Sequence, residues 1–312
     1  MKKNFVNSEF IEGRLYQHNL VIKTVKNEKS ANFGKEFISG TIDIATDEEG
    51  LNVIPIHYTY VTEVTSTGKT SSTFTNLRNI INGARTWVTD GKDLALKVRC
   101  NTAIGLNDFY NQNDELVSAK RNEGGFVSTV KDLVPEAERS TFDCDMVITS
   151  VTRVEGDGEP DYLRIKGGIF DFRKALLPVE FICRREDGMS YFEGLDASPS
   201  NPVFTEVKGK IVSNTIKREI EEESAFGSAS VKTVTRTVRE WQITWARPTE
   251  YDFGAEDTLT AEELKKAMQD RQVYLANVKK QRDDYLASRN TSNEVRDTAN
   301  NAMNVPTGSF DF

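Results

Sequence analysis

Hydrophobic and polar residues alternate with a period of two along much of the first half of the chain. Side chains of a strand point alternately to opposite faces, so this pattern predicts half-buried β-strands. The segments that show it are residues 20–25, 37–45, 53–61 and 94–106. In the last of these segments apolar residues share one face, and Lys97, Arg99 and Asn101 share the other.

A short helix is predicted inside this series of strands. Apolar residues from Leu77 to Ala84 recur three or four positions apart, which places them on one face of a helix between the third and fourth strands. Beyond the fourth strand a polar loop leads to Gly124 and Gly125. Paired glycines predict a tight turn there, or a place where the backbone approaches a ligand closely.

The charged segment from Lys131 to Ser140 contains Pro135 and predicts a linker to a second block of strands. The strands expected in this block are residues 141–154, 162–169, 179–183, 191–195, 203–218 and 231–245. Many short strands with turn residues between them are typical of an antiparallel barrel or sandwich. We therefore expect a mainly β chain with a first domain over residues 1–132 and a second antiparallel β domain over residues 141–253.

The carboxyl end changes from strands to a long helix, expected over residues 259–289. Thr260 and Glu263 have the spacing of a capping box at its start. Its apolar stripe is heptad-like, and we expect it to pack on its own domain in preference to pairing with another molecule. The polar, Asn-rich residues 290–312 predict a flexible tail.

Length and composition limit the class of protein. A chain of 312 residues is long enough for about two domains. No window approaches the roughly 18 apolar residues of a membrane span, and no apolar run follows the charged start, so we expect a cytoplasmic protein. The three cysteines lie far apart, which fits a reducing compartment. The net charge of -8 requires that any nucleic-acid affinity come from locally clustered cations.

The motifs of common enzyme chemistries are incomplete in this sequence. Gly68-Lys69-Thr70 resembles the end of a phosphate-binding loop, but Glu63 stands where the first glycine of that motif belongs. The two histidines have no partner at ligand spacing, and Asp143 with Asp145 lacks a third acidic ligand nearby. We therefore expect neither enzyme activity nor a metal or other cofactor.

Basic and aromatic side chains are interleaved on the predicted sheet faces, which is the arrangement that single-strand binding needs. Cations follow the phosphates, while aromatic rings stack on the bases with little regard to sequence. The residues expected to bind DNA in this way are Lys35, Tyr58, Tyr60, Trp87, Lys97, Arg99, Asn101, Phe109, Tyr110, Lys120, Arg121, Phe126, Tyr162, Arg164 and Lys166.

The order of three strands, a helix and two strands across roughly residues 15 to 130 is similar to an OB-fold. Gly34 to Ala45, Val98 to Tyr110 and Gly124-Gly125-Phe126 resemble bacteriophage single-stranded DNA-binding proteins. The resemblance implies an OB-like barrel in the first domain. It also implies non-catalytic, sequence-independent coating of single-stranded DNA during phage DNA replication or recombination, in the cytoplasm of the host cell.

The last residues resemble the acidic, phenylalanine-ended tail of bacterial single-stranded DNA-binding proteins. That resemblance implies that Phe310, Asp311 and Phe312 dock on replication or recombination proteins, although this tail has a single Asp and no adjacent Pro. A homo-oligomer is compatible with the sequence. The alternative function is that of a virion structural protein of the tail or baseplate, whose β-barrels assemble through protein contacts alone.

Overall fold

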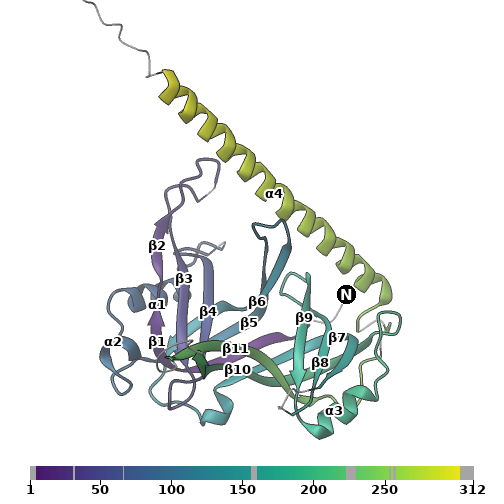
Figure 1. The fold of residues 1–312 in the computed structure, drawn as a ribbon. Helices are drawn as coiled ribbons and strands as arrows, with labels where there is room; N and C mark the ends of the chain where they lie inside the picture. The colour runs from purple at the N-terminus through teal and green to yellow at the C-terminus, as the bar shows by residue number, and fades with distance from the viewer. Residues whose placement is uncertain are drawn as a thin grey trace, which may run out of the picture.

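A computed structural model describes residues 5–302 apart from 31, 66, 156–159, 223–229, 253 and 256–257, with the backbone alone described for 214–238 and 288–302. The chain is mainly β, and its eleven described strands belong to one sheet (Figure 1). The strands are β1 (Asn7–His18), β2 (Val21–Thr24), β3 (Glu36–Ala45), β4 (Val53–Thr62), β5 (Lys97–Tyr110), β6 (Leu116–Thr129), β7 (Ser140–Val154), β8 (Tyr162–Phe170), β9 (Leu176–Cys183), β10 (Val203–Glu222) and β11 (Ser230–Ala246). The helices are α1 (Ser72–Ile81), α2 (Trp87–Asp90), the 3-10 turn η1 (Glu136–Glu138), α3 (Glu186–Glu193) and α4 (Ala261–Ala302).

Five strands of the first half close into a barrel. β1 pairs with β3, β3 with β4, β6 with β5 and β5 with β1, all antiparallel, while β4 pairs with β6 in parallel. In chain order, helix α1 follows β4 and precedes β5, which are the third and fourth strands of this barrel. The cyclic order and the place of the helix are those of an OB-fold, so the OB-like barrel expected from the sequence is confirmed.

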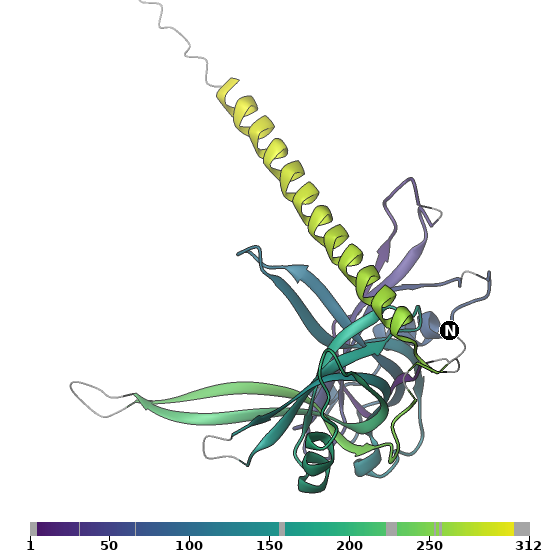
Figure 2. The same cartoon turned by 90° about the vertical axis from the view of Figure 1, so that its right-hand side faces the viewer.

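The second half closes in the same order. β7 pairs with β8, β8 with β9, β11 with β10 and β10 with β7, all antiparallel, while β9 pairs with β11 in parallel. Helix α3 again separates the third strand from the fourth. The second β block is therefore a second OB-type barrel, and its β10–β11 hairpin extends well beyond the barrel wall (Figure 2).

The two barrels share strand pairing and core. Asn7 to Ile11 of β1 pair with Ser140 to Cys144 of β7, which makes the sheet continuous from one barrel to the other. A single cluster of buried apolar side chains includes members of both barrels, such as Ile56 and Phe181. The barrels are thus joined edge to edge over a common core.

The first barrel strand is β1, and the expectation that the strands begin with residues 20–25 was wrong. That segment forms β2, a short strand at the edge of the sheet whose four side chains are all exposed. The alternation in β1 was hidden because Glu9 and Glu12 occupy buried positions. Glu12 accepts hydrogen bonds from Arg99 and from the backbone N–H of Val134, which is why an acid is tolerated there.

Two further expectations about elements were wrong. Residues 191–195 were expected to form a strand, but Tyr191 to Glu193 complete helix α3. Residues 120–127, expected as a loop with a tight glycine turn, lie inside strand β6. A Cβ on Gly124 would stand 2.4 Å from the Tyr58 ring, and one on Gly125 would stand 2.2 Å from a carbonyl oxygen of β5. The paired glycines therefore allow close strand packing.

Helix α4 begins with the expected capping box and packs on its own chain. The backbone N–H of Glu263 donates to the Thr260 hydroxyl, and the Glu263 carboxylate accepts from the Thr260 backbone N–H. Arg271 makes two hydrogen bonds to Asp108 of β5, whose carboxylate is almost fully buried. The helix continues to Ala302, past the end expected at residue 289, and its far half projects from the barrels (Figures 1 and 2). None of the described helices combines the length and apolarity needed to cross a membrane.

Candidate nucleic-acid interface

The second and third strands of an OB barrel form its usual ligand-binding side, and in the first barrel these are β3 and β4. The rings of Phe37 and Tyr60 lie 4.7 Å apart there, and Tyr60 is 47% exposed. Asn32 donates to the Tyr60 hydroxyl at 3.3 Å, and Lys35 donates to the Asn32 side chain at 3.2 Å. We call these four residues the first-barrel face, which brings the predicted residues Lys35 and Tyr60 together.

The equivalent side of the second barrel is formed by β8 and β9. Tyr162 begins β8, and the guanidinium of Arg184, directly after β9, lies 4.7 Å from its ring centre. Arg164 and Lys166 follow along β8, and both form ion pairs with Glu180, at 3.2 and 3.8 Å. We call these five residues the second-barrel face, which brings together all three predicted residues of the second half.

The two faces occupy equivalent positions in the two barrels. Phe37 pairs with Thr62 near the end of β4, and Leu163, next to Tyr162, pairs with Cys183 at the end of β9. Each barrel therefore places an aromatic ring at the start of its second strand, beside the end of its third strand. A second ring or a guanidinium lies against it in each case. Such rings are suited to stacking on unpaired bases.

Strand β6 lies between the two faces. Arg121 donates to the Thr59 hydroxyl of β4 at 3.4 Å and pairs with Glu123 at 2.6 Å. The preceding residue, Lys120, donates to the backbone carbonyl of Glu180 on β9. Consecutive residues of β6 thus contact the third strand of each barrel.

Lys120 itself belongs to the contact between the barrels and not to an open groove, which corrects its predicted role. Its ammonium lies 4.6 Å from the ring centre of Trp241 and 5.6 Å from that of Phe181. Burial lowers the pKa of Lys120 to about 8. A cation enclosed in this way is poorly placed to meet a phosphate.

The predicted residues of β5 gather on a different part of the surface. Lys97 donates to the backbone carbonyl of Lys131, and Arg99 pairs with the buried Glu12 at 2.5 Å. Asn101 is exposed and stands opposite Phe126 of β6, whose ring is 44% exposed.

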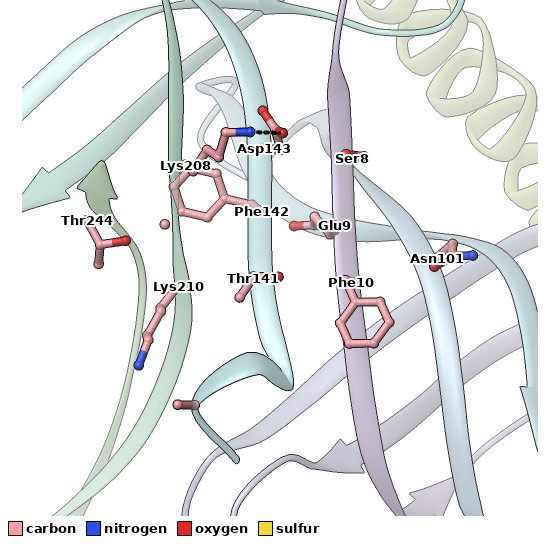
Figure 3. A pocket seen from close by; sticks show the side chains of 12 residues that line it. Ser8, Glu9, Phe10, Asn101, Thr141, Phe142, Asp143, Lys208, Lys210 and Thr244 are labelled. Carbon is pink, nitrogen blue, oxygen red and sulfur yellow. Dashed lines mark hydrogen bonds and ion pairs between the residues drawn. The ribbon is translucent and has the colours of Figure 1, made fainter. Parts of the chain in front are cut away.

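Of these residues, Asn101 lines a groove of about 540 Å³ at the join between the barrels (Figure 3). We call it the junction groove, and its lining includes Phe10, Asn101, Thr141, Lys208 and Lys210. Lys208 pairs with Asp143 and Glu206, each at 2.9 Å. The groove therefore combines strand residues of both barrels.

Tyr58 and Trp87 were expected to be stacking platforms, and the structure places them elsewhere. Tyr58 is 2% exposed and belongs to the core, so its ring is not available to a base. Burial also raises its pKa far above the ordinary tyrosine value. The half-buried ring of Trp87 lies 6.0 Å from that of Tyr16, with the Lys92 ammonium 5.7 Å away. Trp87 thus stabilises the α2 region against β1.

Phe109 and Tyr110 lie at the far end of β5, apart from both faces. Lys279 and Arg282 of α4 cover the Tyr110 ring at 5.6 and 5.9 Å, whereas Phe109 is 42% exposed. Tyr110 therefore helps to hold α4. The tail residues Phe310, Asp311 and Phe312 lie outside the described residues.

Carboxylates already neutralise several predicted cations. Arg99, Arg121 and Arg164 each form an ion pair with a glutamate. By contrast, Lys35 and Lys210 form no ion pair with any carboxylate of the described residues. A phosphate backbone must therefore compete for most of the arginines, which leaves a larger share of any affinity to the aromatic rings.

One histidine and the three cysteines are partly or fully withdrawn from solvent. His57 shares a hydrogen bond with Thr41, and burial lowers its pKa. Cys100, Cys144 and Cys183 are buried free thiols whose pKa values are raised by burial. Within the part of the chain that the structure describes, no three His, Cys, Asp or Glu side chains form a group that could hold a metal ion.

The residues of these surfaces that were not predicted include the two rings Phe10 and Phe37 and the two cations Arg184 and Lys210. Phe37 had a signal in the sequence, because it begins an alternating strand on the side opposite Ile38. Phe10 lies in the strand that was missed. Arg184 and Lys210 could be placed only by strand pairing between distant segments, which no local pattern reveals.

The fold and these surfaces define a mainly β protein of two joined OB-type barrels with aromatic and basic side chains on equivalent strands. A model of the YorF family matches residues 10–281, and the chain belongs to that family. A comparison with curated proteins found no match. Among solved structures, a deletion mutant of the single-stranded DNA binding protein from Thermus aquaticus is 11% identical, covers 81% of this chain and 98% of that chain, and gives a TM-score of 0.47. So low an identity and score carry no argument, and the OB assignment stands on strand pairing.

Proposed function

We propose that the protein binds single-stranded DNA along the first-barrel and second-barrel faces, without catalysis and without reading the base sequence. The observation that carries the proposal is the repeated placement of an aromatic ring at the start of the second strand of each barrel. Stacking of a base on such a ring contributes about 1 to 3 kcal/mol and accepts any base. Lys35 and the arginines beside the rings would meet the phosphates.

DNA replication and recombination are the processes that expose single strands, and we place the function there, in the cytoplasm. The phage setting comes from the sequence resemblance described above. Partner proteins recruited by Phe310, Asp311 and Phe312 and assembly into a homo-oligomer belong to the same proposal. No step of it requires a cofactor.

Fluorescence anisotropy of a labelled oligo-dT strand tests the proposal, with titrations of the full chain at two salt concentrations and duplex DNA as competitor. We expect binding that weakens as salt rises, because phosphate contacts release counterions, and that duplex DNA does not displace. Absence of binding at low salt would overturn the proposal. Light scattering would then test for DNA-free assembly, which the alternative virion role requires.

A single substitution tests the first-barrel face. Tyr60→Ala should weaken oligo-dT binding by roughly five- to tenfold, because it removes one stacking platform worth about 1 kcal/mol or more. Tyr285→Ala is the matched control, since Tyr285 is 59% exposed on α4. Equal affinities of the two variants would remove the first-barrel face from the binding site.

A further inference from the structure

The junction groove is separate from the two faces and has its own chemistry. We propose that it holds one nucleotide of the bound strand as a third contact, an inference that rests on the proposed function. The groove measures about 540 Å³, within the range of roughly 300 to 1,000 Å³ typical of small-ligand sites. It lies where strands β1, β7 and β10 run side by side (Figure 3).

One rung of the sheet supplies the groove and crosses both barrels. Asn101 pairs with Phe126 on one side and with Phe10 on the other. Phe10 in turn pairs with Thr141, and Thr141 pairs with Lys210. Directly paired residues of neighbouring strands lie side by side, so these five side chains form a continuous row. The row contains two rings, an amide, a hydroxyl and an ammonium.

The two ends of the groove suit the two parts of a nucleotide. The half-buried Phe10 ring carries the Arg99 guanidinium 5.4 Å from its centre, which gives a platform for a base. Across the groove, the exposed Lys210 forms no ion pair with a described carboxylate, whereas Lys208 is held by Asp143 and Glu206. Lys210 is therefore the cation available to a phosphate. Lys208 contributes little charge, because its acids neutralise it.

A continuous outer surface connects the first-barrel face with the groove. Asn122 and Val127 of β6 are both buried although five positions separate them, because the bulge at Gly124 and Gly125 shifts the alternation. Arg121 and Phe126 consequently both face outward. Arg121 touches Thr59 of β4, and Phe126 begins the row of groove residues. A strand leaving β4 can thus follow β6 to the groove.

The test compares oligo-dT strands of increasing length on the full chain. Lys210→Glu and Lys210→Gln should leave short strands bound as tightly as by the unaltered protein. Lys210→Glu should weaken the binding of long strands by about tenfold and reduce the steepness of the log–log salt dependence by about 0.7, the value for one lost phosphate contact. Phe126→Ala should also weaken the binding of long strands and leave the binding of short strands unchanged, since it removes an exposed ring from the row.

Lys265→Glu, on the exposed side of α4, is the control that makes the same change of charge. If Lys210→Glu matches this control at every length while Tyr60→Ala still weakens binding, the groove is not a contact and the proposed function stands. If Lys210→Glu weakens short and long strands equally, the groove is part of the primary site and the idea of a third contact is wrong. If the unaltered protein binds no oligo-dT, both proposals fail.

Discussion

Glu9 is a buried acid that joins the two barrels. Its carboxylate accepts a hydrogen bond from the indole of Trp241 at 2.9 Å and another from the Thr102 hydroxyl at 2.8 Å. Burial raises the pKa of Glu9 to about 7, although both hydrogen bonds act in the opposite direction. The carboxyl therefore carries its proton over a pH range in which an exposed glutamate has lost it.

The stability of the protein should consequently depend on the charge of Glu9. Its pKa is about 7 when folded and 4.5 ordinarily, so its contribution is fully present below pH 4.5 and is lost as pH rises through about 7. The loss is on the order of 3 kcal/mol, from about 1.4 kcal/mol for each pKa unit. Urea unfolding at several pH values should show this fall, and Glu9→Gln should remove it. A parallel pH dependence in the variant would contradict the assignment.

Tyr58 and Tyr60 show how far single residues could be predicted. A strict period of two places both rings on one face of β4, and the sequence offers no reason to separate them. In the structure β4 carries a bulge, because Tyr58 pairs with Gly40 and Val61 pairs with Ile38, so that two residues of β4 oppose one of β3. Tyr58 therefore belongs to the core and Val61 packs against it, whereas Tyr60 is 47% exposed beside Phe37. A bulge depends on the pairing with the neighbouring strand, which local alternation does not record.

At the scale of the element, the bulge in β6 depends on the missing side chain of Gly124. Gly124→Ala would place a Cβ 2.4 Å from the Tyr58 ring, in a packed region with little room to adjust. We expect a loss of about 1 to 3 kcal/mol in the free energy of unfolding, as is usual for overpacking. Gly194→Ala is the matched control, because its nearest contact would be an ordinary 3.4 Å. The urea midpoints of the two variants measure the effect. Equal midpoints for Gly124→Ala and Gly194→Ala would show that β6 can shift to accommodate the added Cβ.

Elements with strong local periodicity could be predicted, and those governed by distant contacts could not. The apolar spacing near Leu77 correctly predicted α1, whose Phe74, Leu77 and Ile80 are buried. In α3 the buried residues Met189 and Phe192 are three apart, but the helix is only eight residues long. Such a short helix gives too few turns for its period to differ clearly from a strand. Strand β1 was not predicted, because the sequence does not distinguish a buried acid from an exposed one.

At the scale of the molecule, each barrel closes through the pairing with the fewest residues in register. The parallel pair β4–β6 has two residues in register and β9–β11 has one, and each joins segments about sixty residues apart. Closure was therefore predictable for the first barrel only through its resemblance to a known fold. For the second block, the strand pattern of the sequence is equally consistent with a closed barrel and with a sandwich, so its closure could not be predicted.

The continuous sheet and the shared core lead to a prediction about cooperativity. The division into domains over residues 1–132 and 141–253 remains a prediction, and the hydrogen bond between Glu9 and Trp241 crosses it. Because β1 pairs with β7 and one apolar cluster serves both barrels, we expect both to unfold in a single transition. Urea curves from circular dichroism and tryptophan fluorescence should coincide. Trp241→Phe leaves Trp87 and Trp245 as probes of the first and second barrels, and it should lower the midpoint of both signals together. Two separate transitions would show that the barrels are independent domains despite their common sheet.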